Sequence, residues 1–351
     1  MRFQHKIAPL FSRLRPRFGL TNRYSETAAR SWEIAPALES EALPAIFEES
    51  DVQKITGVYP GNTFADELER IVGRVVRHGP TMAYEFENAV LANGHLFTHR
   101  AALALGTSKP PWLARATPEI ESGVLASTRL GVRYFGHWML DDLSLLLAAQ
   151  KLGRAISVND RFTPGQIGYL ELLSLKPEVM TEGLFRRMTV IDDAGLNAYR
   201  KERLLQLREA AARRSRPSNA PGVMLLRGNS GHLRRLVNED EIAQIARRRG
   251  FLVVYPEQAS AAELLDACFG APIVLGVEGS QLTNGAMWMA ERGVVVTLQP
   301  PQRFTSVVKN WCDLLGARYA FMIGDAREDD SFHVDGNTVE RLLDKAQAAI
   351  C

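Results

Sequence analysis

After Pro221, short apolar runs alternate with longer segments that place apolar residues at helical spacing. The apolar runs predict strands at 223–226, 251–254, 272–277, 294–298 and 319–322. Capping patterns predict the helices between them: Asn238 with Glu241, Ser260 with Glu263, a helix over 305–315, and a last helix capped by Asn337 and Glu340. Strands that alternate with helices imply a parallel sheet covered by helices on both faces.

Ligands of such sheets bind at the carboxyl ends of the strands. Arg227, the turn at Glu278 and the segment 299–301 all fall at such ends. The C-terminal part of the chain therefore presents these residues as candidates for a binding site.

The N-terminal half has a different pattern. Thr63 followed by Asp66 predicts the start of a helix, and Asn93-Gly94 between two apolar pairs predicts a β-hairpin. Further strands are expected at 155–158 and 188–191, and helices at 169–175 and 196–214. This half is expected to open with antiparallel strands before any α/β alternation.

The segment 213–221 combines arginines, serines and two prolines, which is typical of a linker. A chain of 351 residues fits two domains of ordinary size. We predict a basic tail and extended entry segment over 1–50, an N-terminal domain over 51–215 and a C-terminal domain over 216–351.

One stretch, 274–285, changes from an apolar strand into glycine and small polar residues. Gly279 allows a tight turn, and Ser280 is expected to cap a helix that runs to about Glu291. Backbone N–H groups from Gln281 to Thr283 would suit a phosphate. The alternative is purely structural, because any strand–turn–helix corner of an α/β sheet needs a glycine and a cap.

A second stretch, 134–147, predicts a helix with two distinct faces. Its leucines at 140, 143 and 147 should pack inward, whereas His137, Asp141 and Ser144 share another face. A histidine one turn before a carboxylate suits a general base and the group that orients it. Alternatively, His137 and Asp141 only stabilise the first turn of the helix.

Composition and charge narrow the classes of function. A formal net charge of +2 is too small to require a polyanion, so nucleic acid is not an expected partner. Three distant cysteines offer neither zinc spacing nor a disulfide framework, which favours a reducing compartment. No apolar run approaches the roughly 20 residues that cross a bilayer, so we expect a cytoplasmic protein. Residues 1–20 interleave basic and apolar side chains, which fits either a disordered tail or peripheral contact with a membrane.

Several specific motifs do not occur in the sequence. No G-x-G-x-x-G follows the first strand, and neither a Walker lysine motif nor an Asp-x-Asp metal motif is present. Adjacent pairs such as Asp141-Asp142 point apart and seldom chelate one ion. A nucleotide-dependent α/β enzyme of another kind, such as a dehydrogenase, stays open as an alternative but lacks its fingerprint.

Three motifs in order resemble the family 61 glycosyltransferases. The first is Phe135-Gly-His-Trp-Met-Leu-Asp141, which is similar to the family's Y-G-H-W-L-x-D/E element. The second is Leu226-Arg227 followed by Arg234-Arg-Leu-Val-Asn-Glu239. The third is Gly276-Val-Glu-Gly-Ser-Gln-Leu-Thr-Asn284, which aligns with G-x-H-G-A-G-L-T-N. Together they span roughly 135–301.

The resemblance implies a GT-B architecture: two Rossmann-like domains with parallel sheets, here with β-hairpin elements added to the N-terminal one. It implies a nucleotide sugar, taken as a UDP-sugar, bound mainly by the C-terminal domain. It also implies a glycan or glycolipid acceptor on the N-terminal side and inversion at the anomeric carbon. The last helix would pack back on the N-terminal domain. No cofactor and no divalent ion are expected.

The same resemblance assigns roles to residues. His137 would be the base and Asp141 its orienting group. The donor would be held by Arg227 and Arg234 at the diphosphate, by the 279–283 backbone, and by the polar groups around it: Asn238, Glu278, Gly279, Ser280, Gln281, Leu282, Thr283 and Asn284. Without the resemblance, Arg227 is explained as a strand-end residue and Arg234 as a partner of Glu239.

The chain departs from the family pattern at Glu278, where the family has histidine. A carboxylate repels a diphosphate unless it is paired or protonated. Four interpretations follow: Glu278 binds a sugar or ribose hydroxyl, it is neutralised by Arg227 or Arg234, the donor differs, or the protein is an inactive relative that only binds a nucleotide sugar or glycan.

Overall fold

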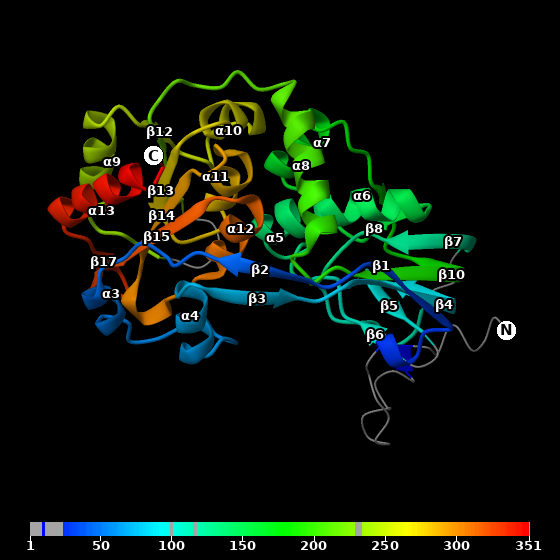
Figure 1. Cartoon of the computed structure of the whole chain (residues 1–351). Coiled ribbons are helices and arrows are strands. Elements are labelled where there is room, and N and C mark those ends of the chain that lie inside the picture. The colour runs from blue at the N-terminus through cyan, green and yellow to red at the C-terminus, as the bar shows by residue number, and fades with distance from the viewer. Residues whose placement is uncertain (1–8, 11–23, 99–100, 115–117, 229–233, 351) are drawn as a thin grey trace. The chain divides into compact units, whose positions relative to one another are not determined.

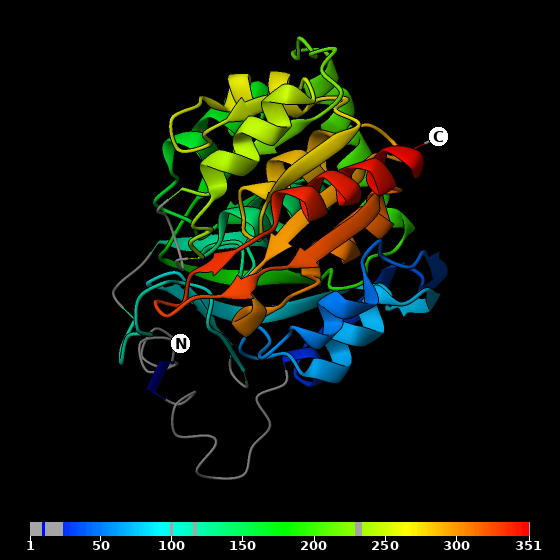
Figure 2. The same cartoon turned by 90° about the vertical axis from the view of Figure 1, so that its left-hand side faces the viewer.

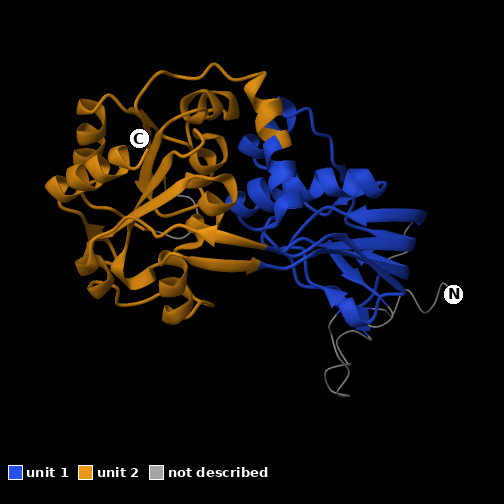
Figure 3. Ribbon diagram, viewed as in Figure 1, with its two compact units in different colours: residues 1–38, 78–205 blue, residues 39–77, 206–351 orange. Residues whose placement is uncertain are grey.

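The computed structural model describes residues 9–10, 24–98, 101–114, 118–228 and 234–350. The chain forms two compact units, shown in blue and orange in Figure 3. Unit 1 comprises Met1–Leu38 and His78–Leu205, and unit 2 comprises Glu39–Arg77 and Gln206–Cys351. In the described residues no helix is both long and apolar enough to cross a membrane.

Unit 2 is built on a five-stranded parallel sheet with the order β12-β11-β13-β14-β15, as the alternating pattern predicted. Its strands are β11 (Val223–Leu225), β12 (Leu252–Val254), β13 (Ile273–Val277), β14 (Val294–Gln299) and β15 (Arg318–Ile323). The chain leaves β11 toward one edge of the sheet and continues from β13 toward the other. Strands β11 and β13 therefore flank the topological switch point, where doubly wound folds bind their ligands.

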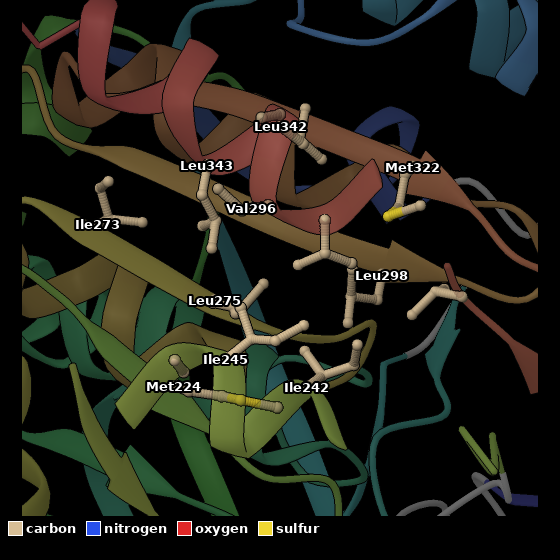
Figure 4. Packing of buried hydrophobic residues seen from close by; sticks show 14 of the residues in the cluster. Met224, Ile242, Ile245, Ile273, Leu275, Val296, Leu298, Met322, Leu342 and Leu343 are labelled. Carbon is tan, nitrogen blue, oxygen red and sulfur yellow. The ribbon is translucent and has the colours of Figure 1, made fainter. Parts of the chain in front are cut away.

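Helices cover both faces of this sheet (Figures 1 and 2). Helices α9 (Glu239–Arg248) and α13 (Gly336–Ala348) contact each other, and α13 also lies on β14 and β15. On the other face, α11 (Leu282–Trp288) contacts α10 (Ala261–Cys268) and α12 (Val307–Leu315). Figure 4 shows Leu342 and Leu343 of α13 directed at the sheet beside Val296. The last helix thus buries its apolar face within unit 2.

Helix α11 lies close to β13 because Gly285 has no side chain. A Cβ at Gly285 would lie 2.2 Å from Val274 Cγ1 in the buried strand. We expect Gly285→Ala to lower the free energy of unfolding by about 1–3 kcal/mol, the usual cost of overpacking. Chemical denaturation would measure it. Gly79→Ala is the matched control, because nothing lies within 4 Å of that added Cβ, and equal midpoints for the two variants would contradict the expectation.

The segment 39–77 of unit 2 carries β2 (Leu38–Ala42), β3 (Arg74–His78), α3 (Glu49–Gln53) and α4 (Phe64–Ile71). Buried carboxylates tie it to the end of the sheet and to α12. Asp51 Oδ1 accepts the backbone N–H of Ile323 at 3.0 Å, and Glu67 Oε2 accepts that of Ser306 at 2.6 Å. Burial raises the pKa of Asp51 despite these bonds.

Unit 1 contains a mixed eight-stranded sheet with the order β6-β5-β4-β10-β7-β8-β9, and β1 pairs with β4. Antiparallel pairing joins β4 to β1, β5 and β10, whereas β10, β7, β8 and β9 pair in parallel. The strands are β1 (Arg30–Ala35), β4 (Thr81–Ala92), β5 (His95–Phe97), β6 (Ala102–Leu103), β7 (Glu119–Leu125), β8 (Ala155–Ser157), β9 (Glu178–Val179) and β10 (Gly183–Asp192).

The predicted hairpin of unit 1 is confirmed. Strands β4 and β5 pair with Leu91 opposite Leu96, and Asn93 and Gly94 have positive φ angles of 51° and 71° between them. The helices of unit 1 are α5 (Phe135–His137), α6 (Leu143–Leu152), α7 (Pro164–Leu172) and the first part of α8 (Ala198–Ala212).

The two units divide the chain at other positions than the predicted domains. Residues 51–77 belong to unit 2, and the division at 205/206 falls inside helix α8 instead of in the following segment. Long-range bonds such as that of Glu67 explain the first difference, because they join an early segment to a late one. Units defined by contacts do not test functional domains, so those ranges stay predictions.

The predicted caps have mixed outcomes. Thr63 with Asp66 and Ser260 with Glu263 form the expected capping boxes. Asn238 stands at the start of α9 and donates to Glu241 Oε2 at 2.9 Å, but its side chain caps no backbone N–H of the helix. It also donates to Val334 O at 2.8 Å and accepts Val334 N–H at 3.3 Å. The prediction of Asn337 and Glu340 as caps is wrong. Helix α13 begins at Gly336, so Asp335 precedes it and accepts the N–H of Thr338 at 2.8 Å.

Candidate active site

Arginines converge on Glu278 at the switch point of unit 2. Arg234 Nε lies 2.8 Å from Glu278 Oε2, and its Nη1 donates to Glu278 O at 3.0 Å. Arg303 Nη1 donates to the same Oε2 at 2.9 Å. Arg227, which follows β11, donates from Nη1 to Gln281 Oε1 at 2.7 Å. We call Arg227, Arg234 and Arg303 the arginine cluster.

The arginine cluster carries more positive charge than Glu278 cancels. The pKa of Arg234 is lowered to about 10, chiefly by burial; the charge of Glu278 opposes this shift, and the charges of Arg303 and Arg227 add to it. Burial likewise lowers the pKa of Arg227. These guanidinium groups remain protonated at neutral pH because even the shifted value for Arg234 lies well above 7. Glu257 and Glu239 also oppose the lowered pKa of Arg227, so the arginine cluster as a whole lies among three carboxylates.

Gly279 lets Arg227 lie against the turn. A Cβ there would be 2.6 Å from Arg227 Nη1 and 2.4 Å from Gln281 Oε1. The backbone N–H of Arg227 donates to Glu239 Oε1 at 2.7 Å. This bond fixes the backbone of Arg227, while its guanidinium reaches the turn and donates to Gln281. Arg227 is therefore more than a strand-end residue. Arg234 pairs with Glu278 and not with Glu239, which instead accepts the backbone N–H of Arg227.

The prediction of Ser280 as a helix cap is wrong. Helix α11 begins at Leu282, its preceding residue is Gln281, and it ends at Trp288, short of Glu291. The N–H groups of Leu282 and Thr283 donate to Gly279 O and Ser280 O at 3.1 and 3.2 Å. These tight turns use two of the three N–H groups, from Gln281 to Thr283, that were expected to face a phosphate.

The remaining predicted donor-side residues have structural contacts. Leu282 is fully buried in the core. Its Cδ2 would lie 3.0 Å from a Cβ added at Gly276. Asn284 Nδ2 donates to Gln281 O at 3.0 Å and so fixes the turn, which is one of the roles considered for it. Asn238 joins α9 to Val334.

Sequence reasoning missed Arg303, although it located the neighbouring segment 299–301 at a strand end. Arg303 lies in the 3₁₀ turn η4 (Pro301–Arg303). Gly57 N–H donates to Pro301 O at 3.1 Å, and Gly57 O accepts Phe304 N–H at 2.9 Å. The guanidinium of Arg303 also stacks over the ring of Tyr59, 4.6 Å from its centroid. A segment from the early part of the chain thus positions this arginine.

In unit 1 the structure brings the predicted pair together. His137 Nδ1 lies 2.7 Å from Asp141 Oδ2, and Arg200 of α8 pairs with the other carboxylate oxygen of Asp141. Arg200 is itself held by a bond to Asp193 O at 2.8 Å. The helix is wound as a π-helical turn, η3 (Trp138–Asp142), between α5 and α6, a local distortion that is frequent at functional sites.

This geometry gives His137 a defined orientation. An ionised carboxylate only accepts hydrogen bonds, so Nδ1 carries the hydrogen that faces Asp141, and in the neutral ring Nε2 holds the lone pair. Asp141 is held on both oxygens and cannot turn away. His137 is 28% exposed in its side chain, so solutes can reach the ring.

The next residue, Asp142, points the other way, as the adjacent-pair argument predicted. It is buried and accepts the N–H and hydroxyl of Thr128 at 2.9 and 2.8 Å. A Cβ at Gly131 would meet its carboxylate, so the glycine leaves room for it. Burial raises the pKa of Asp142 well above its ordinary value of 3.8.

Asp142 should make stability depend on pH. As pH rises above 3.8, the unfolded carboxyl loses its proton first. The folded carboxyl keeps its proton until the higher folded pKa is passed, so the free energy of unfolding falls across this window. Asp142→Asn keeps an oxygen for Thr128 and should remove this contribution. Denaturation from pH 4 upward would measure it, and equal slopes in both proteins would contradict the assignment.

The described residues contain no group of three or more His, Cys, Asp or Glu side chains arranged to hold a metal ion. Absence of such a group leaves the expected metal independence a prediction.

Unit 2 is a doubly wound α/β unit with three arginines and Glu278 at its switch point, and unit 1 adds an oriented histidine. Residues 135–296 match the family Glycosyltransferase 61. The predicted resemblance to this family is thereby confirmed for that stretch, and the family implies a glycosyltransferase with sugar donor and acceptor substrates. The matched range includes His137, Asp141, Arg227, Arg234 and Glu278, whereas Arg303 follows it. No curated protein matches the chain.

Proposed function

We propose that the protein is an inverting, metal-independent glycosyltransferase of the GT-B class. It transfers a sugar from a nucleotide sugar, a UDP-sugar, to a surface polysaccharide such as a capsule or to a glycolipid. The observation that carries the proposal is the arginine cluster at the β11–β13 switch point, in a chain that matches a glycosyltransferase family.

The arginine cluster would hold the donor's diphosphate and stabilise the charge that builds up on it as the sugar leaves. Glu278 pairs with Arg234 and Arg303, which supports the interpretation that it is neutralised by arginine. Its carboxylate relieves repulsion between guanidinium groups that would otherwise lie close together.

The acceptor hydroxyl must lose a proton as it attacks the sugar. His137 Nε2 would take that proton, while Asp141 holds the ring and stabilises the imidazolium that forms. Direct attack of the hydroxyl on the sugar carbon inverts that centre. We place the reaction in the cytoplasm, with peripheral membrane contact through residues 1–20. Apart from Pro9 and Leu10, that tail lies outside the described residues.

One observation favours a second candidate, a relative that binds a nucleotide sugar or glycan without transfer. The carboxylate of Glu278 occupies two of the three arginines where an anion would bind. Donor binding by the purified protein without turnover would support this candidate over the enzyme.

A thermal-shift panel of UDP-, GDP-, CMP- and dTDP-sugars tests the proposal. A ligand present at a hundred times its dissociation constant stabilises the native protein by about 2.7 kcal/mol. We expect the UDP-sugars to shift the unfolding temperature most. No shift with any nucleotide sugar would contradict the assigned donor class.

A further inference from the structure

Unit 1 contains a cavity of about 540 Å³, within the range of small-molecule sites. Asp141 and Arg200 form part of its wall. It therefore reaches the carboxylate that holds His137.

Aliphatic side chains make up most of the cavity wall. They come from four segments of unit 1, with Leu103 and Leu105 near β6, Leu125 on β7, Leu145 on α6, and Val190 on β10. The deeper ones, Leu125, Leu145 and Val190, are 2–4% exposed, whereas Leu130 of the same wall is 44% exposed. The cavity thus has an aliphatic interior and a side that opens to solvent.

The cavity combines aliphatic and charged side chains but offers little aromatic surface. Tyr24 is the aromatic side chain among the residues that line it, so it has little surface on which a sugar ring could stack. Its polar lining consists of two hydroxyl and five charged side chains: Ser127, Thr128, Arg129, Asp141, Asp192, Asp193 and Arg200. An amphipathic ligand fits this distribution, with an aliphatic chain in the interior and hydroxyl groups at the charged side.

We propose that this cavity binds the aliphatic chain of a lipid-linked acceptor, so that the acceptor is a glycolipid. This inference rests on the proposed glycosyltransferase function. It places the sugar head of the acceptor beside Asp141, the residue that orients the base.

The segment that follows the Leu103–Leu105 wall supports a membrane as the source of the ligand. Trp112 and Leu113 are 63% and 56% exposed, and Lys109 is exposed shortly before them. An exposed aromatic and aliphatic pair near a basic side chain suits the headgroup region of a bilayer.

The test uses the full chain without any nucleotide sugar and measures binding of n-dodecyl β-D-glucoside below its micelle concentration. Isothermal titration would compare it with the octyl glucoside and with glucose. We expect affinity to rise with chain length and glucose not to bind measurably. Ala102→Trp and Leu103→Trp fill the cavity from half-buried wall positions and should each weaken dodecyl glucoside binding by about tenfold or more.

Ala262→Trp, at an exposed position of α10 in unit 2, is the matched control and should bind like the unchanged protein. Failure of the dodecyl glucoside to bind, or equal binding by the cavity variants and the control, would overturn the inference. Donor binding is read separately in the nucleotide-sugar panel. If dodecyl glucoside does not bind but a UDP-sugar still shifts the unfolding temperature, only the glycolipid acceptor is rejected. If dodecyl glucoside binds but no UDP-sugar shifts the unfolding temperature, the transferase function is rejected.

Discussion

Replacement of His137 by alanine is expected to lower the rate of sugar transfer by about 10²-fold or more while donor affinity stays nearly unchanged. The imidazole is the group oriented by Asp141, and its loss leaves the attacking hydroxyl without a proton acceptor. The arginine cluster lies in unit 2 and keeps all its bonds. Turnover with a glycolipid acceptor and thermal shift with the donor would measure the two effects separately.

His333→Ala is the matched control, because His333 is a half-buried histidine on β17 (Phe332–His333), within unit 2. It should transfer sugar at the unchanged rate. Asp141→Asn should also slow transfer, since the amide no longer specifies which ring nitrogen carries the hydrogen. Transfer by His137→Ala at the original rate would remove His137 from the role of base.

Replacement of Arg234 by methionine is expected to weaken binding of UDP by about 10- to 150-fold. Hydrogen bonds to charged groups contribute about 1.5–3 kcal/mol, and each 1.4 kcal/mol is a factor of ten. Arg303→Met should have an effect of the same order, although the sequence motifs did not indicate this residue. Titration calorimetry with UDP would measure both affinities.

Arg247→Met, at an exposed position late in α9, is the matched control for a lost arginine. Either cluster variant leaves Glu278 with one arginine partner, so circular dichroism should verify the fold. Unchanged UDP affinity in both cluster variants would show that the donor binds elsewhere. Loss of affinity in Arg303→Met alone would assign the diphosphate to the η4 side of Glu278.

Local chemistry made much of the fold predictable. The Asn93-Gly94 hairpin formed as expected because two residues with positive φ reverse a chain between apolar pairs. Ser260 capped its helix because Glu263 was the nearest available partner. Asn238 shows the limit of such reasoning, because the backbone of Val334, distant in the sequence, bonds its side chain.

In the candidate site, too, contacts within one helical turn were predictable and contacts between distant segments were not. His137 and Asp141 were predictable because one helical turn brings them together. Arg200 was not, because it comes from α8 and reaches Asp141 only when α8 lies beside the π-helical turn. Likewise, the sequence located the end of β14 at the ligand edge but did not reveal that Arg303 turns toward Glu278.

The sequence by itself determined the parallel sheet of unit 2, the location of Arg227 and Glu278 at strand ends, and the match of residues 135–296 to a glycosyltransferase family. These follow from periodicity and motif order, which are properties of neighbouring residues. Only the tertiary structure decided the partners of Glu278, the support of η4 by Gly57 and Tyr59, and the aliphatic cavity of unit 1. Each of these depends on contacts between distant segments, and their geometry is fixed only when the cores pack.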